Sequence, residues 1–221
     1  MAHGALIEHR PWLFASLCAA IIYYFVWNNP LGGLWLILLK GAGVGFLAIY
    51  AMRRTRGLDG ALLVLMLALA SAADMVLEIN FRVGGVVFFA SHLVACVLYV
   101  RHWRGPIAVW DLGIAAAFVI ITPLVSYQVS ENELLAIYSV ALGAMAATAW
   151  LSAYPRHRVA AGAMLFILSD WLLFARNGPF DPGPIADALV WPTYYAGQLM
   201  IATGVVQSLR FEAGRGAAPA V

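Results

Sequence analysis

Long apolar stretches recur along the whole chain and constrain its fold more than any other feature. A membrane-spanning helix needs about 20 mostly apolar residues. Eight segments meet this requirement, and turn or charge signals separate them: residues 12–27, 31–52, 58–78, 83–103, 106–126, 132–153, 158–176 and 190–209. Backbone polar groups in lipid must be satisfied within their own segment. The sequence therefore predicts an all-α membrane protein with eight transmembrane helices, in one integral-membrane domain spanning residues 1–221.

The composition supports the same class. The chain is 63% hydrophobic and only 11% charged, with a mean hydropathy of +0.85. Soluble domains carry about 45–50% apolar and about 25% charged residues. A net charge of +2 indicates no particular partner. We therefore expect contacts with membrane lipid and none with nucleic acid, and the oligomeric state stays open.

The first apolar stretch could be mistaken for a signal peptide, because Arg10 precedes it. The small residues of a cleavage site do not follow; the sequence continues instead with "NNP" at residues 28–30. We interpret this stretch as the first retained span of a multi-pass protein, with the bacterial inner membrane as the expected location.

Arginines are distributed unequally between the loops on the two sides of the predicted membrane. Ten lie on one side: Arg10, Arg53, Arg54, Arg56, Arg101, Arg104, Arg156, Arg158, Arg210 and Arg215. The other side has only two, Arg82 and Arg176, next to several acidic residues. Loops rich in Lys and Arg face the cytoplasm. Both termini are therefore predicted to be cytoplasmic, in agreement with an even number of spans.

Two pairs of segments suggest an internal repeat. "LASAADMVL" in the third span is similar to "LFILSDWLL" in the seventh, and "FFASHLV" in the fourth is similar to "YYAGQLM" in the eighth. Repeats four helices apart have the same orientation, so they would be related by an axis along the membrane normal. We predict a four-plus-four internal repeat.

Five strongly polar side chains lie inside predicted spans: Lys40, Asp74, His92, Asp170 and Gln198. A charged residue at the centre of a spanning helix costs about 2.5–3.5 kcal/mol on insertion scales, and such residues usually mark functional sites. The alternative is structural: Lys40 would pair with an aspartate, while His92 and Gln198 would hydrogen-bond between helices. Glu78, one turn after Asp74, is interpreted as a solvated residue at the membrane boundary.

Depth in the membrane relates these residues. At a rise of about 1.5 Å per residue, Asp74 lies about 6 Å inward from Glu78, and Asp170 about 9 Å inward from Arg176. The same arithmetic places all five residues in the outward half of the membrane or near its midplane. The sequence therefore predicts a polar pocket, with Asp74 and Asp170 facing each other across it.

Short motifs around these residues stand in a defined order: "LLK" ending at Lys40, Ser71-x-x-Asp74, "GGVVFFASHLVACVLY" with His92 and Tyr99, "GAMLFILSDWLL" with Asp170, and "YYAGQLMIATG" with Tyr195 and Gln198. In this order they resemble the YhhN-like lysoplasmalogenase family of eight-span membrane alkenyl ether hydrolases. Two positions depart from the family pattern. Gly41 stands where Pro usually follows the lysine, and Ala73 stands where Gly usually precedes the first aspartate.

The resemblance implies an enzyme that hydrolyses the vinyl ether bond of a lysoplasmalogen to a fatty aldehyde and a glycerophospho-alcohol. It implies catalytic roles for Asp74 and Asp170, with substrate-binding roles for Lys40, His92, Tyr99, Tyr195 and Gln198. The implied partner is a vinyl-ether lysophospholipid, with no cofactor and no metal.

The residue chemistry is compatible with this activity. A vinyl ether is cleaved after a proton reaches its β-carbon, so the acid must still be protonated near neutral pH. A low-dielectric site with two close carboxyl groups resists double ionisation, which leaves one group as acid and the other as base. The same intramembrane carboxylates would also suit a proton- or ion-coupled transporter. A retinal protein with Lys40 as Schiff base is a more distant alternative.

Overall fold

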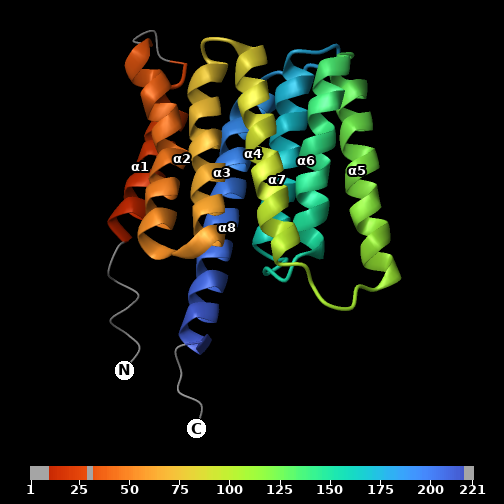
Figure 1. Cartoon of the computed structure of the whole chain (residues 1–221). Coiled ribbons are helices and arrows are strands. Elements are labelled where there is room, and N and C mark those ends of the chain that lie inside the picture. Colours follow the sequence, from red (N-terminus) through yellow and green to blue (C-terminus); the bar gives the residue numbers. More distant parts are fainter. Residues whose placement is uncertain (1–9, 29–31, 217–221) are drawn as a thin grey trace.

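The computed structural model describes residues 10–28 and 32–216, which form a bundle of eight α-helices (Figure 1). The helices are α1 (Arg10–Val26), α2 (Leu34–Arg54), α3 (Gly57–Leu77), α4 (Phe81–Arg101), α5 (Val109–Ser130), α6 (Glu133–Leu151), α7 (Val159–Arg176) and α8 (Pro184–Gly216). Consecutive helices run in opposite directions, so α1 begins and α8 ends at the same end of the bundle. The prediction of an all-α protein with eight helices is confirmed.

Most helix boundaries lie within three or four residues of the predicted spans, and local signals explain several of them. Asn80 and Asn132 cap α4 and α6, accepting hydrogen bonds from the backbone N–H groups of Val83 and Leu134 at 3.1 and 2.9 Å. Glu131, with φ of 51°, ends α5 in the left-handed conformation. Of the break predicted at residues 28–30, positions 29 and 30 lie outside the described residues.

Helix α8 differs most from its prediction, since it begins at Pro184 rather than at residue 190 and extends to Gly216. Gly183 precedes it with a φ of 57°, and proline is favoured in the first turn, where its missing N–H is not needed. The additional turns bring Asp187 to the end of the bundle where Lys40, Asp74 and Asp170 lie. The structure thus adds a wall to the predicted pocket.

Within the described residues, six helices, α2 to α7, are long and apolar enough to cross a membrane. The apolar part of α1, Pro11–Val26, is shorter, and α8 is longer and less apolar. An integral membrane protein is therefore supported by composition and length. Membrane crossing by α1 and α8, and the orientation of the termini, stay predictions.

Helix α8 joins the two halves of the bundle. It packs against α7 and also against α1, α2 and α3, while α4 packs against α6. In a four-plus-four repeat, α2 corresponds to α6 and α4 corresponds to α8. The contact between α2 and α8 would therefore correspond to the contact between α6 and α4. A four-plus-four repeat would produce this relation. The duplication itself stays a prediction.

Small residues let α7 approach α8 closely, and α2 approach α3. A Cβ atom on Gly162 of α7 would lie 2.7 Å from the Gly197 carbonyl oxygen of α8, so the two backbones touch. On α2, a Cβ on Gly41 would lie 3.1 Å from the Ser71 carbonyl oxygen of α3. Close approach at small residues is the usual way in which membrane helices pack.

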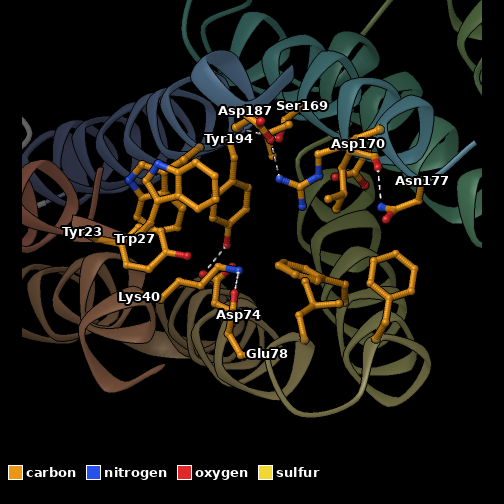
Figure 2. A pocket seen from close by; sticks show the side chains of 17 residues that line it. Tyr23, Trp27, Lys40, Asp74, Glu78, Ser169, Asp170, Asn177, Asp187 and Tyr194 are labelled. Carbon is orange, nitrogen blue, oxygen red and sulfur yellow. Dashed lines mark hydrogen bonds and ion pairs between the residues drawn. The ribbon is translucent and has the colours of Figure 1, made fainter. Parts of the chain in front are cut away.

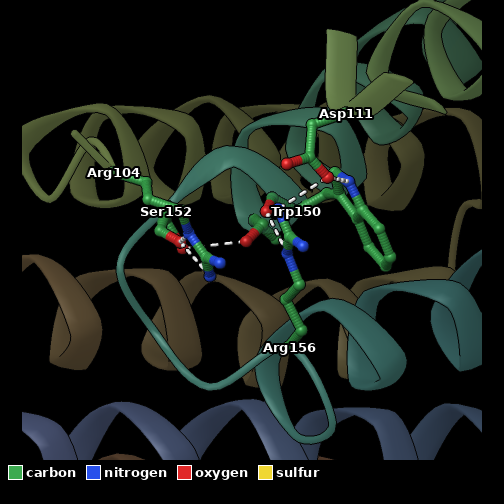
Figure 3. A network of polar contacts seen from close by, with 6 residues as sticks. Arg104, Asp111, Trp150, Ser152 and Arg156 are labelled. Carbon is green, nitrogen blue, oxygen red and sulfur yellow. Dashed lines mark hydrogen bonds and ion pairs between the residues drawn. The ribbon is translucent and has the colours of Figure 1, made fainter. Parts of the chain in front are cut away.

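A polar network lies at the lower end of the bundle in Figure 1, where α4 and α6 end (Figure 3). Arg156 pairs with Asp111 at 2.7 Å and stacks over the Trp150 ring, 4.4 Å from its centroid. Arg104 donates two hydrogen bonds to the Ser152 carbonyl, at 3.0 and 3.2 Å. These contacts tie the loop after α4 and the start of α5 to the end of α6.

Candidate active site

A cavity of about 310 Å³ lies at the opposite end of the bundle, between α1, α2, α3, α4, α7 and α8 (Figure 2). Aromatic rings form much of its wall, among them Tyr23, Trp191 and Tyr194. Its polar lining consists of Lys40, Asp74, Glu78, Ser169, Asp170, Arg176, Asn177 and Asp187. Polar groups of both signs therefore converge in a space walled by apolar helices, which is typical of a small-molecule site.

Asp74 is 2% exposed and lies on α3 facing the cavity. The hydroxyl of Tyr194, on α8, donates a hydrogen bond to Asp74 Oδ2 at 2.7 Å. One turn earlier on α3, the Ser71 hydroxyl donates to the Gly41 carbonyl at 2.7 Å, which holds this face of α3 against α2. The sequence motif Ser71-x-x-Asp74 thus combines a helix-packing contact with a carboxyl group in the cavity.

Asp170 lies on α7, on the far side of the cavity from Asp74 (Figure 2). The Tyr138 hydroxyl, on α6, donates to Asp170 Oδ2 at 2.8 Å, and His92 Nε2 lies 2.8 Å from the same hydroxyl. Since Tyr138 gives its only proton to Asp170, His92 must donate from Nε2. Three helices therefore contribute to one chain of hydrogen bonds that ends at the carboxyl group.

Lys40 reaches the cavity from α2 and pairs with Glu78 Oε1 at 2.5 Å. The structural alternative, an ion pair between Lys40 and an aspartate, is wrong about the partner, which is Glu78. Glu78 is 39% exposed in its side chain, as expected of a boundary residue, yet it also lines the cavity. The lysine is consequently held at the rim by a partly solvated carboxylate, whereas Asp74 and Asp170 lie deeper.

A second ion pair lies at the same rim. Arg176, in the last turn of α7, pairs with Asp187, in the first turn of α8, at 3.3 Å. Both side chains are more than one-third exposed, so the pair is open to solvent and contributes little to stability. The cavity therefore has two cations at its entrance, each paired with a partly exposed carboxylate.

The seven residues predicted from the sequence divide into two groups. Lys40, Asp74 and Asp170 line the cavity. The other four, His92, Tyr99, Tyr195 and Gln198, are buried but are not among its lining residues. Their substrate-binding roles stay predictions.

These four residues have different surroundings. His92 supports Asp170 through Tyr138, and Gln198 lies beside Tyr194, one turn away on α8. The Tyr195 hydroxyl pairs with that of Ser16 at 2.8 Å, which ties α8 to α1. The Tyr99 ring packs against Tyr154, with 6.1 Å between centroids, and its hydroxyl has no hydrogen-bond partner among the described residues.

Sequence reasoning missed the two tyrosines that hold the aspartates. Tyr194 lies one turn before Gln198 on α8, so that spacing could have identified it as part of the same helix face. Tyr138 is a single tyrosine in the apolar helix α6, and no motif singles it out. The partners Arg176 and Asp187 flank a loop, and their pairing depends on the early start of α8.

Comparison with known protein families shows which family the chain belongs to. The model of the YhhN family matches residues 35–205. The chain belongs to the YhhN family. This match covers α2 through most of α8 and includes both aspartates and both tyrosines of the site. Neither the curated proteins nor the solved structures gave a match to this YhhN-family protein.

Proposed function

We propose that this YhhN-family protein is a membrane hydrolase that cleaves the vinyl ether bond of lysoplasmalogens. One observation carries the proposal: Asp74 and Asp170, from the two halves of the chain, line the same cavity, each with a tyrosine hydroxyl on its Oδ2 atom. Membership of the YhhN family agrees with a membrane hydrolase. The substrate would be a single-chain phospholipid with an alkenyl chain.

The reaction needs one acid and one base. A carboxylic acid transfers its proton to the β-carbon of the vinyl ether, and the double bond becomes an oxocarbenium ion. The partner carboxylate takes a proton from water, whose oxygen attacks the α-carbon and forms a hemiacetal. The bond between this carbon and the glycerol oxygen then breaks, the glycerol oxygen takes the proton held by the base, and the hemiacetal hydroxyl returns a proton to the acid as the fatty aldehyde is released. Glycosidases use two carboxyl groups in a comparable way.

The rim of the cavity would bind the head group. Lys40 and Arg176 supply positive charge, and both are side chains that bind phosphate well. In the free protein Glu78 and Asp187 pair with them. Because these carboxylates are partly exposed, a phosphate can replace them at little desolvation cost.

The distribution of arginines would place the cavity on the non-cytoplasmic side. The cavity lies where α2, α4 and α8 begin, opposite the ends at which Arg54 and Arg101 stand. If the arginine-rich end faces the cytoplasm of a bacterial inner membrane, the cavity opens in its outer half. Substrate would then come from the outer leaflet.

The test is turnover of an alkenyl lysophospholipid by purified protein in detergent, with release of fatty aldehyde as the readout. Release that requires both Asp74 and Asp170 supports the proposal. Its competitor is a transporter that uses the same carboxylates. A wild-type protein that releases no aldehyde but carries protons across proteoliposomes would replace the hydrolase with that transporter.

A further inference from the structure

A second cavity, of about 320 Å³, lies between the first turns of α4, the first turns of α6 and the end of α7. Apolar side chains form most of its lining, among them Val86, Phe89 and Leu135. Val86 and Ile137 are 69% and 61% exposed, on the outer faces of α4 and α6. Large apolar side chains on the outside of a membrane bundle face lipid. This apolar cavity therefore opens sideways, toward the hydrocarbon region.

The apolar cavity and the polar cavity adjoin. Leu77, Phe81, Phe88, Leu173 and Asp170 line both of them. Asp170 is the one ionisable residue in this shared set. Asp74, Lys40 and Arg176 line the polar cavity and are not among the residues that line the apolar one. The two carboxyl groups thus occupy different places, with Asp170 at the junction and Asp74 on the polar side.

We propose that the apolar cavity holds the hydrocarbon chain of a single-chain lipid, which enters between α4 and α6, and that Asp170 is the residue that protonates its vinyl ether. The proposal rests on the function proposed above. A lysophospholipid has one chain and one charged head, which matches one apolar cavity joined to a polar cavity with two cations at its rim. The bond between chain and head must then lie at the junction.

This placement assigns the proton transfers. Asp170 gives its proton to the β-carbon, and the Tyr138 hydroxyl stabilises the carboxylate that forms. Asp74, on the head-group side, takes a proton from the attacking water. When the hemiacetal breaks down, Asp74 returns its proton to the glycerol oxygen and the hemiacetal hydroxyl returns one to Asp170. One water is consumed, and both carboxyl groups recover their initial states.

Gly85 offers a way to fill the apolar cavity without disturbing the bundle. It lines this cavity from α4, and a Cβ atom built on it meets no atom within 4 Å. Gly85→Phe should therefore place a ring in the space meant for the chain. Gly113 is a matched control, because it lies in α5, is exposed, is equally open to a Cβ atom and lines neither cavity.

The first measurement is kcat/KM for two vinyl-ether lysophospholipids, one with a hexadecenyl and one with a propenyl chain. Gly85→Phe should lower the value for the long chain by about tenfold or more, because long chains lose apolar contacts, and leave that for the short chain nearly unchanged. Gly113→Phe should match wild type on both. Equal long-chain turnover by wild type and Gly85→Phe, with both active, would overturn the inference while the proposed function stands.

The second measurement is binding of a hexadecyl lysophospholipid whose saturated ether cannot be hydrolysed. Binding that Gly85→Phe weakens and Gly113→Phe does not would support the cavity assignment even if wild type released no aldehyde. Absence of aldehyde release would reject the proposed function, and with it the role of Asp170 as the acid, but not the cavity assignment. An analogue with a diazirine on the second chain carbon locates the reacting end of the chain. Photolabelling should modify Asp170; labelling of Asp74 instead would overturn its assignment as the acid.

Discussion

The Tyr138 hydroxyl donates a hydrogen bond to Asp170 Oδ2 at 2.8 Å, from a helix that no motif links to the site. Replacing Tyr138 by Phe removes this donor and leaves the ring. A hydrogen bond to a charged group contributes about 1.5–3 kcal/mol, so we expect kcat to fall about 10- to 100-fold. Substrate binding should change little, since the carboxylate needs the donor only after it has given up its proton.

Tyr154→Phe is the matched control for this prediction. Tyr154 is also buried, but its hydroxyl has no hydrogen-bond partner among the described residues and it lines neither cavity. Aldehyde release by this variant should equal that of wild type. A Tyr138→Phe variant with normal kcat would show that the hydroxyl is irrelevant to the reaction.

Asp74→Asn and Asp170→Asn should each lower aldehyde release by at least about 100-fold, because general acid–base steps contribute about 10²–10⁴-fold. Asparagine has nearly the same shape as aspartate, so the fold should be retained. Asp59→Asn is the control: it changes an aspartate on the same helix as Asp74, in an ion pair with Arg101 at 2.6 Å at the other end of the bundle. This control should turn over at a near-normal rate.

The double variant distinguishes a cooperating pair from two independent contributions. Residues that act as a unit have strongly non-additive effects. Asp74→Asn combined with Asp170→Asn should therefore be scarcely slower than either single variant. Losses that multiply would mean that each carboxyl works without the other.

The sequence predicted the fold because membrane helices are specified locally. Eight apolar segments, interrupted by signals such as "NNP" and by the capping residues Asn80 and Asn132, determine where helices begin and end. The extra turns of α8 were missed because Asp187 and the nearby prolines lowered its apolar character. Proline at the first position of a helix is compatible with helix formation, and that signal was available in Pro184.

The site was only partly predictable, for a physical reason. A charge inside a membrane segment is costly, so Asp74, Asp170 and Lys40 could be recognised from position alone. Tyrosine has no such cost at the membrane interface, where it is common. Tyr138 and Tyr194 therefore look like ordinary packing residues until the structure places them on the aspartates.

Substitutions at Lys40 and Glu78 separate head-group binding from a structural ion pair. If Lys40 binds phosphate, Lys40→Gln should raise KM about tenfold, the effect of losing about 1.4 kcal/mol of binding, while kcat changes less. Glu78→Gln should lower KM, because it removes the competitor for the lysine. If the ion pair is only structural, Lys40→Gln and Glu78→Gln should change KM in the same direction.

An alkenyl glycerol without phosphate is the control substrate for this measurement. It cannot use a cation at the rim, so Lys40→Gln should leave its KM unchanged. A larger KM for both substrates would show that the substitution disturbs the cavity rather than the phosphate contact.

The Arg156 network should matter for stability and not for turnover. Arg156 pairs with Asp111 and stacks on Trp150, which together require a planar guanidinium group. Arg156→Lys keeps the charge but loses this geometry, so the thermal unfolding temperature in detergent should fall. Aldehyde release below that temperature should be unaffected, because the network lies at the end of the bundle opposite the cavity.

The orientation of the bundle determines which leaflet can supply substrate, and cysteine labelling can test it. Gly105 and Asp181 are exposed residues in the loops after α4 and α7, at opposite ends of the bundle. With Cys18 and Cys96 replaced by alanine, a single cysteine is introduced at either position. The ten-to-two distribution of arginines predicts that Gly105→Cys lies in the cytoplasm and Asp181→Cys outside it.

A membrane-impermeant maleimide should therefore label Asp181→Cys in intact spheroplasts and label Gly105→Cys only after the membrane is opened. The cavity lies at the Asp181 end, where Arg176 and Asp187 pair across the same loop. Labelling of Asp181→Cys would thus place this end of the cavity on the outer side of the membrane, next to the outer leaflet. The reverse pattern would place the cavity on the cytoplasmic side and reject the arginine-based orientation. Labelling of both cysteines in intact spheroplasts would place the two loops on one side, which an odd number of crossings between them does not allow.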